Sequence, residues 1–542
     1  MSSLENPSNL YDELIQNSTE YSEFWGPIPK SMAASIDLSQ QVQINDENRS
    51  KHVEKLITIL REYHKSLGIY SSKVEDHLSL LKHGSIVVGQ QPVIFGGPGF
   101  IGNKFAALIF LHLLAEEKGV KMAPIFFLGD YDGIQKELAR QYYPNPISSN
   151  AVSVDAEEYL PLDSNIASHS AELPPQQWLF ETLQRLDDNL RGFKKKVKGP
   201  ARKTLESRWD HIQTLLKMSF NNSSTLSDWA ASIWGNIVNI INDYGIILLP
   251  TSHPEVRKLV APEYLKFIIN REKYAAEFEQ SMHKLRDMGY EPTLPDRHST
   301  YSPFMLECAE DNSRIATQLV EKEGNVWVDC QCPSCKRKYA FRVDSEEFLL
   351  EHATQFGPRV DSSQALFQNL LGIKIRISGP GEIAYYAQTA PALRKIGFTT
   401  PIFIRYKRAY YNTSWNELLG KQLDSRSQPS LLTQEMFDIM RERHTGIKED
   451  NVDILRTAEN KMKSYILDTY HNLEKLENNN DVSTYLGWQF GKFHEYKFGQ
   501  EVSWMWIDLA LQTGLTDYIP TYLRMYHKNS PPSGIYFLNT SI

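Results

Sequence analysis

The spacing of apolar residues divides the chain into helical and strand-like stretches. Residues 1–80 have a helical pattern, in which Leu56, Leu60, Tyr63 and Leu67 recur three or four positions apart. We expect this region to form an N-terminal helical segment. Short continuous apolar runs begin at about residue 81, and they are typical of buried strands.

A strand, a helix and a second strand follow one another in this next region. Ser85–Val88 and Pro124–Leu128 are apolar runs of strand length, and Phe105–Leu114 between them is a strongly apolar helix. Parallel strands joined by a helix are the repeating unit of Rossmann-like sheets. A second such unit is indicated at Ile373–Ile377 and Pro401–Arg405. We therefore expect an α/β fold with a Rossmann-like parallel-sheet core over residues 81–410.

Three further regions interrupt or follow this core. Residues 145–245 are mostly polar and helical, and we interpret them as an insertion. Residues 295–345 carry the cysteines and short alternating strands, which predicts a small connector module. Residues 411–542 are expected to be helical, with apolar faces that could pair as a coiled coil. These faces carry Leu432, Met436, Ile439 and Met440, and then Ile454, Leu455, Ala458 and Met462.

Composition and charge favour a globular enzyme. At 542 residues the chain is too long for one simple core, so two or three lobes are expected. A net charge of −8 gives no general reason to expect nucleic-acid or membrane binding. The most apolar stretch, Ala106–Ala115, is too short to span a bilayer, and Met1–Tyr21 is unlike a secretory signal. We therefore expect a cytoplasmic enzyme.

Two glycine-rich segments are the most informative feature of the chain. Val88–Lys104 and Ser378–Tyr385 each follow an apolar run and lead into a helical pattern. Glycine bares backbone N–H groups, and a helix N-terminus directs them toward an anion. We expect the two segments to line one cleft for an anionic small molecule, either nucleotide-like or acyl-activated.

The first segment also matches the G-x-G-x-x-G fingerprint of dinucleotide-binding folds, through Gly97, Gly99 and Gly102. Asp130 ends the next strand, where a ribose-binding acid would lie, but it is 28 residues beyond Gly102 rather than about 20. The motif leaves two alternatives open, which are an NAD(P)-dependent oxidoreductase and a purely structural strand–helix turn.

Charged side chains near the first segment are candidates for catalysis. Lys104 lies in the first turns of a predicted helix, where a cation suits anion binding; the alternative is a surface lysine. Asp130 and Asp132 follow a buried strand at the carboxyl edge of the sheet, where ligands bind. Two carboxylates at this spacing could bind a cation, an amine or sugar hydroxyls, and turn capping is the alternative.

The second segment offers polar groups on the helix that follows it. Glu382 is expected in the first helical turn, where a carboxylate also serves as an ordinary helix-start residue. Tyr385 and Gln388 are three positions apart and share a helix face. They could contact polar substrate atoms, or the helix could simply pack with a tyrosine on each side.

All four cysteines lie within 28 residues, which argues against a disulfide framework. Cys332 and Cys335 form a C-x-x-C pair of the type that binds zinc, with Cys330 nearby and Cys308 as the fourth thiolate. We predict a structural zinc site at Cys308, Cys330, Cys332 and Cys335. Thioredoxin-like redox chemistry is disfavoured because no thioredoxin-type strand–helix–strand unit surrounds the pair. Reduced structural cysteines are the remaining alternative.

These segments together resemble the family of bacillithiol-pathway cysteine-adding enzymes. The resemblance covers most of the chain loosely and contains two specific blocks. The first block is Gly89-Gln90-Gln91 followed by Gly97-Pro98 and Lys104, and the second is Ser378–Tyr385 followed by Gln388, Pro401 and Arg405.

The resemblance implies a fold, a reaction and a set of site residues. It implies a Rossmann-like core related to class I aminoacyl-tRNA synthetases, and a coiled coil that forms a homodimer. The implied reaction joins the carboxyl of cysteine to the amine of glucosaminyl-malate, through a carboxyl that ATP activates. The expected catalytic residues are Lys104, Asp130, Asp132 and Glu382, and the expected substrate-binding residues are Gln90, Gln91, Gly97, Gly99, Asn103, Tyr131, Gly379, Gly381, Tyr385, Gln388 and Arg405.

The chain departs from the family pattern at two imidazoles. The family's acidic turn reads Glu-Asp-His-Asp, whereas this chain has Gly129-Asp130-Tyr131-Asp132. Asn103 stands where the family has a histidine before the helix lysine. Imidazoles can act as acid or base near neutral pH, so their loss leaves a third alternative, a non-catalytic zinc-stabilised ligand-binding protein.

Overall fold

The computed structural model describes residues 6–17, 22–44, 49–143, 152–160, 162, 165–195, 197–412, 434–474 and 500–540. It confirms the predicted α/β class. Its centre is a five-stranded parallel sheet in the order β12-β11-β1-β2-β5. The strands are β1 (Ser85–Gln90), β2 (Ala123–Leu128), β5 (Ile247–Pro250), β11 (Ile373–Ser378) and β12 (Ile402–Arg405).

Both faces of this sheet are buried, which explains the continuous apolar runs of β2 and β5. Val88 and Phe126 face one hydrophobic cluster, which also contains the apolar residues of α6 (Phe100–Glu117). Val87 and Ile125 face a second cluster, which α4 (Arg49–Ser66) and α5 (Ser72–Leu80) help to form. The helices that complete this second layer are α11 (Pro254–Val260), α12 (Glu263–Ile269), α13 (Arg271–Asp287) and α15 (Val360–Leu371).

The first helices of the chain pack on α16 (Pro380–Lys395), which follows β11. Tyr11 donates a hydrogen bond from its hydroxyl to Phe403 O at 2.6 Å, and the Trp25 indole donates to Ile383 O at 2.8 Å. These contacts attach α1 (Pro7–Asn17) and α2 (Ser22–Trp25) to the core, while α3 (Met32–Ser39) contacts α6.

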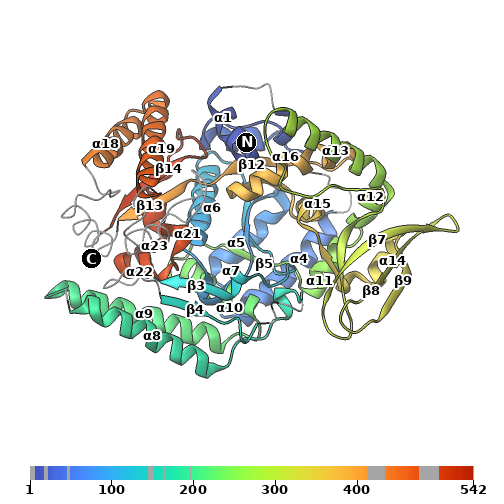
Figure 1. Cartoon of the computed structure of the whole chain (residues 1–542), viewed down its shortest axis with the longest axis horizontal. Coiled ribbons are helices and arrows are strands. Elements are labelled where there is room, and N and C mark those ends of the chain that lie inside the picture. Colours follow the sequence, from blue (N-terminus) through green and yellow to red (C-terminus); the bar gives the residue numbers. More distant parts are fainter. Residues whose placement is uncertain are drawn as a thin grey trace.

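Two extensions leave the central sheet on different sides (Figure 1). The helices α8 (Gln176–Lys194) and α9 (Pro200–Asn221) lie side by side along the lower edge, beside α10 (Leu226–Gly235). A second, antiparallel sheet in the order β10-β6-β7-β8-β9 lies on the right. The remaining elements of these regions are α7 (Lys136–Ala139), β3 (Arg140–Tyr143), β4 (Val152–Asp155), β6 (Tyr301–Glu307), β7 (Arg314–Lys322), β8 (Asn325–Gln331), β9 (Lys338–Arg342), α14 (Glu346–Glu351) and β10 (Phe356–Pro358).

The C-terminal region contains the two helices that the sequence predicts to form a coiled coil. α18 (Gln434–Lys448) and α19 (Val452–Glu474) pack against each other within the chain, with Met436, Leu455 and Met462 buried. Leu432 lies outside the described residues, and the homodimer stays a prediction. The chain ends in α21 (Gln500–Ser503), α22 (Ile507–Thr513), α23 (Leu515–Leu523) and β14 (Ile535–Asn539), which pairs with β13 (Arg408–Asn412).

Among the helices of the described ranges, none combines the length and the apolar character that a bilayer-spanning segment requires.

Candidate active site

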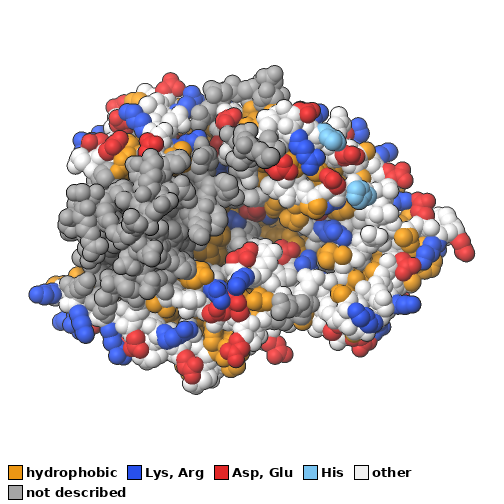
Figure 2. Space-filling model, in the orientation of Figure 1, with side chains coloured by type: hydrophobic (Ala, Val, Ile, Leu, Met, Phe, Trp, Pro, Cys, Tyr) orange, Lys and Arg blue, Asp and Glu red, His pale blue; other side chains and the backbone are white. Residues whose placement is uncertain are grey.

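The carboxyl ends of the parallel strands collect most of the predicted polar residues. Gln90 ends β1, Asp132 follows β2, and Glu382 lies in the first turn of α16 after β11. Figure 2 shows this face hollowed near its centre, in the area that α6, α7, α15 and α16 surround in Figure 1. This edge is where open α/β sheets bind their ligands.

Lys104 is the centre of the site. The residue is 3% exposed, and its ammonium donates to Gly89 O at 2.7 Å, Gln90 Oε1 at 3.0 Å and Glu382 Oε2 at 2.9 Å. These three acceptors match the three N–H donors of a lysine. Burial lowers the pKa of Lys104, and the neighbouring Glu382 carboxylate opposes this effect without cancelling it. The lysine is therefore a fixed, buried cation and not a surface side chain.

Glu382 lies between two cations. Its Oε2 accepts from Gly379 N at 2.7 Å as well as from Lys104, and its Oε1 lies 3.6 Å from the guanidinium of buried Arg376. Burial alone would raise the pKa of Glu382, but Lys104 and Arg376 outweigh it and hold the pKa below its ordinary value. One carboxylate with two cations leaves a net positive charge, which attracts an anionic substrate group.

A row of side chains connects this cluster to Asp132. Gln90 Nε2 donates to Gln91 Oε1 at 3.1 Å, and Gln91 Nε2 donates to Asp132 Oδ2 at 3.3 Å. Arg314 lies 3.7 Å from Asp132 Oδ1. Burial raises the pKa of Asp132 despite the opposing effect of Arg314. Of the two carboxylates Glu382 and Asp132, Asp132 has the raised pKa and is therefore the one suited to accept a proton.

Tyrosines form the wall next to Arg376. Tyr131 is buried after β2, and Tyr385 is partly exposed on α16 with its ring 4.7 Å from that of Tyr386. Burial raises the pKa of the Tyr385 hydroxyl well above its ordinary value, and the Glu382 carboxylate adds to the effect. Burial also raises the pKa of the Tyr131 hydroxyl. The hydroxyls of Tyr131 and Tyr385 therefore remain neutral hydrogen-bonding groups at physiological pH.

Asp130, predicted to bind a ligand, is buried and engaged by groups within the protein. Its carboxylate accepts from Thr251 Oγ1 at 2.6 Å, Ser252 N at 2.8 Å and Ser227 Oγ at 3.1 Å. These bonds tie the end of β2 to the residues after β5 and to α10. Asp130 positions its neighbours, and it is not arranged as a ribose-binding acid.

The G-x-G-x-x-G segment is a packing motif in this fold. Gly97 N donates to Ile94 O at 3.1 Å, and Gly99 N donates to Trp504 O at 2.9 Å, so neither amide is directed at a ligand. A Cβ atom on Gly102 would lie 2.4 Å from the Tyr518 hydroxyl. The glycines allow the C-terminal helices to approach α6, as the structural alternative predicts. No observation supports the oxidoreductase.

Asn103 lies apart from Lys104, although the two are adjacent in sequence. Its side-chain amide donates to Glu501 Oε2 at 2.9 Å and to Lys407 O at 2.6 Å, and it accepts from the Tyr526 hydroxyl at 2.7 Å. Burial raises the pKa of Glu501 to about 7. Asn103 therefore joins α6 to the C-terminal region, in contrast to the predicted substrate contact.

Gln388, Arg405 and Gly379 are also engaged within the protein. Gln388 donates to Thr293 Oγ1 at 3.0 Å and accepts from Leu294 N at 3.0 Å. Arg405 is paired with Asp12 on α1. The Gly379 amide, predicted to bind an anion, is used by Glu382, while Gly381 is exposed at the start of α16. These three residues stabilise the surroundings of the site.

Arg376 is the main site residue that the sequence analysis missed. It is a buried charged residue between Ile375 and Ile377 of strand β11, with its guanidinium 5.3 Å from the centre of the Phe127 ring. A cation in a central strand is costly unless it is paired. The place of an arginine within a predicted buried strand is the feature of the sequence that could have identified it.

The cysteine module brings together three of its four cysteines and an aspartate. Cys308 Sγ lies 3.5 Å from Cys335 Sγ, and Cys332 Sγ lies 3.4 Å from Asp311 Oδ2. Ligand atoms from all four residues lie within 4.8 Å of one another. Cys330 is not part of this group, because it lies on β8 opposite Tyr339. The predicted ligand set is therefore corrected at one position, where Asp311 takes the place of Cys330.

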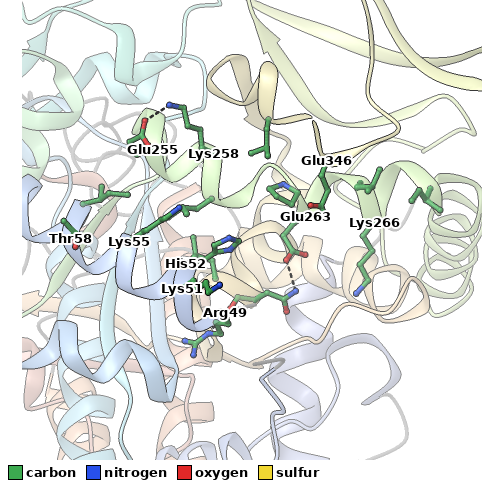
Figure 3. A pocket seen from close by; sticks show the side chains of 18 of the residues that line it. Arg49, Lys51, His52, Lys55, Thr58, Glu255, Lys258, Glu263, Lys266 and Glu346 are labelled. Atoms are coloured by element: carbon green, nitrogen blue, oxygen red, sulfur yellow. Dashed lines mark hydrogen bonds and ion pairs between the residues drawn. The ribbon is translucent and has the colours of Figure 1, made fainter. Parts of the chain in front are cut away.

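A separate groove lies between α4 and α12, with a volume of about 1190 Å³ (Figure 3). Its rim carries charges of both signs, and some are paired with each other, as Lys258 is with Glu255 at 2.6 Å. None of the predicted site residues lines it. The groove is therefore not an extension of the candidate active site.

Comparison with known proteins agrees with this architecture. A family model described as "Bacillithiol biosynthesis BshC, N-terminal Rossmann-like domain" matches residues 2–406. Proteins named "Putative cysteine ligase BshC" are similar to the chain over most of its length. The one from Staphylococcus epidermidis is 21% identical and covers 82% of this chain and 78% of its own. The one from Staphylococcus haemolyticus is 21% identical, with 79% and 80% covered, and the one from Staphylococcus carnosus is 22% identical, with 78% and 73% covered.

Proposed function

Because the chain belongs to the bacillithiol biosynthesis BshC family, we propose that it is a cytoplasmic ligase that forms an amide bond. It would join the carboxyl of cysteine to the amine of a small polar acceptor such as glucosaminyl-malate. The observation that carries this proposal is the buried cluster of Lys104, Arg376 and Glu382, whose net charge is positive. Such a cluster stabilises negative charge that develops on a carboxyl group during acyl transfer.

The polar row next to this cluster supplies the second requirement of the reaction. An attacking amine must lose a proton as the carbon–nitrogen bond forms and the bond to the activating group breaks. Asp132 has a raised pKa and is connected to Lys104 through Gln91 and Gln90. We assign proton acceptance to Asp132, and orientation of polar substrate atoms to the amides of the two glutamines.

ATP is the activating group that the sequence resemblance implies. The glycine turn at Gly97 does not fit its phosphates, because the amides of Gly97 and Gly99 are bonded within the protein and Tyr518 fills the space beside Gly102. The proposal therefore assigns no step to a nucleotide at this turn.

A turnover assay tests the proposed function directly. Cysteine and glucosaminyl-malate supplied with ATP are expected to give a product whose mass is their sum less one water. The same mixture without ATP is expected to give none, because the carboxyl is then not activated. Serine in place of cysteine is the matched control and is expected to give much less product. The proposal would be contradicted if this product were formed neither with ATP nor without it.

We also propose that Cys308, Asp311, Cys332 and Cys335 hold a structural zinc ion. Thiolates and carboxylates are ligands that zinc takes in four-coordinate structural sites, and these four residues offer three thiols and one carboxylate close together. Cys332 and Cys335 lie in the turn between β8 and β9, and Cys308 follows β6, so the ion would join three strands of the antiparallel sheet.

Metal analysis of cysteine variants checks this proposal. Cys335→Ser is expected to lower the zinc content by one equivalent per chain relative to the unchanged protein. Cys330→Ser is the matched control and is expected to retain that equivalent, because Cys330 lies outside the group. Equal zinc contents in the two variants would contradict the assignment.

A further inference from the structure

Two buried histidines meet at the end of the sheet opposite to the candidate active site. His77 on α5 is 4% exposed and His112 on α6 is 2% exposed, and their Nε2 atoms are 3.1 Å apart. His77 Nδ1 lies 2.8 Å from Gly245 O, shortly before β5, and His112 Nδ1 lies 3.0 Å from Met122 O, directly before β2. The pair therefore joins helices that cover opposite faces of the sheet.

These contacts need one more proton than two neutral imidazoles carry. Each nitrogen–oxygen contact requires an N–H, because a carbonyl oxygen only accepts. Both Nδ1 atoms must then be protonated, which leaves the Nε2 lone pair of His77 facing the Nε2 lone pair of His112. Moving either proton to Nε2 removes the donor from a carbonyl contact and leaves that contact unsatisfied. A cation between the two Nε2 atoms resolves this arrangement.

Glu116 supplies a third ligand atom at the same place. It lies one helical turn after His112, and its Oε1 is 3.6 Å from His112 Nε2. The three side chains offer ligand atoms within 4.8 Å of one another. Two zinc–nitrogen bonds of about 2.0–2.1 Å in tetrahedral geometry place the nitrogens about 3.3 Å apart, close to the separation seen here.

We propose that His77, His112 and Glu116 bind a divalent metal ion of the zinc type, with solvent as the fourth ligand. The Nδ1–H bonds to backbone carbonyls fix the tautomer in which both Nε2 atoms are free to coordinate. A shared proton is the competing occupant.

The position of this site, away from the candidate active site, indicates a structural role for the ion. His112 is eight residues after Lys104 on α6, or about 12 Å along the helix. An ion there would fix the C-terminal half of the helix whose first turns carry the catalytic candidate Lys104. It would also join α5 to α6 at the amino-terminal edge of the sheet.

Zinc content and cobalt binding of the full chain test this inference. Glu116→Gln removes the exposed ligand, and Glu117→Gln is the matched control because Glu117 is its exposed neighbour on the same helix. We expect Glu116→Gln to lose one zinc equivalent and to bind added zinc at least about tenfold more weakly at that site. We expect Glu117→Gln to match the unchanged protein.

Cobalt substitution separates this site from the cysteine module. Thiolate-to-cobalt charge-transfer absorption reports the cysteines, so it should be the same in Glu116→Gln and Glu117→Gln. Cobalt d–d absorption without thiolate character should be lost only in Glu116→Gln. Equal zinc contents in these variants, or an unchanged chain in which all bound metal shows thiolate character, would overturn the proposal.

Discussion

Replacing Lys104 with methionine is expected to reduce kcat/KM by about 100-fold or more, the effect of removing one buried group that stabilises transition-state charge. Methionine keeps the length of the side chain but removes the cation that contacts Gly89, Gln90 and Glu382. Steady-state kinetics of amide formation measures this loss.

The same change also affects stability, and a double variant separates the two effects. Glu382 loses one of its two cations in Lys104→Met and keeps Arg376 and the Gly379 amide. Leaving a buried charge partly unpaired destabilises the fold. Lys104→Met combined with Glu382→Gln removes both charges, so we expect it to recover stability in urea denaturation without recovering activity.

Recovery of activity in the double variant would contradict the assigned role, because Lys104 would then act only by neutralising Glu382. Lys118→Met is the matched control. Lys118 directly follows the same helix, where it pairs with exposed Asp37 at 2.6 Å. An exposed pair of this kind contributes little to stability, so the control should retain both activity and fold.

The central sheet could be predicted because its strands are buried on both faces. Ile125 and Phe126 point to different hydrophobic clusters, so the strand needs apolar residues at successive positions. The start of α6 was less predictable. The strongly apolar run begins at Phe105, whereas the helix begins at Phe100. The apolar pattern does not extend to the first turn, which contains Gly102 and packs against Tyr518.

The residues of the candidate site were also only partly predictable from the sequence. A glycine indicates that something approaches the backbone closely, but the sequence does not say what approaches. At Gly102 it is Tyr518, which is 416 positions later in the chain. Likewise, Asp130 and Asp132 look equivalent in sequence, and only the fold brings Thr251 and Ser227 to the first of them.

The cysteine module and Asn103 show that the direction in which a side chain points is also hard to predict from the sequence. Cys330 and Cys332 are both near the C-x-x-C turn, yet only Cys332 joins the group, and Asp311 enters it from a different turn. Asn103 directly precedes Lys104, but successive helix positions point about 100° apart, so it contacts Glu501 instead. Sequence spacing identifies candidates, whereas the fold selects among them.

Asp132→Asn is expected to lower kcat by about 100-fold to 10,000-fold, the range for loss of a general base. Asparagine keeps an oxygen that can accept from Gln91 but cannot take a proton. Because burial raises the pKa of Asp132, activity of the unchanged enzyme should rise with pH through a value above the ordinary aspartate pKa of about 3.9. This acidic limb of the pH–rate profile should disappear in the variant.

Stability measurements distinguish this role from that of Asp130. A raised pKa means that ionising Asp132 costs stability as pH rises from its unfolded pKa through its folded pKa. Asp132→Asn removes that cost. Relative to the unchanged protein, the variant should therefore lose no more stability at neutral pH than it does at acidic pH. Asp130→Asn disturbs an aspartate with three internal donors, so it should lower the free energy of unfolding. A pH–rate profile that keeps its acidic limb in Asp132→Asn would assign the base to another group.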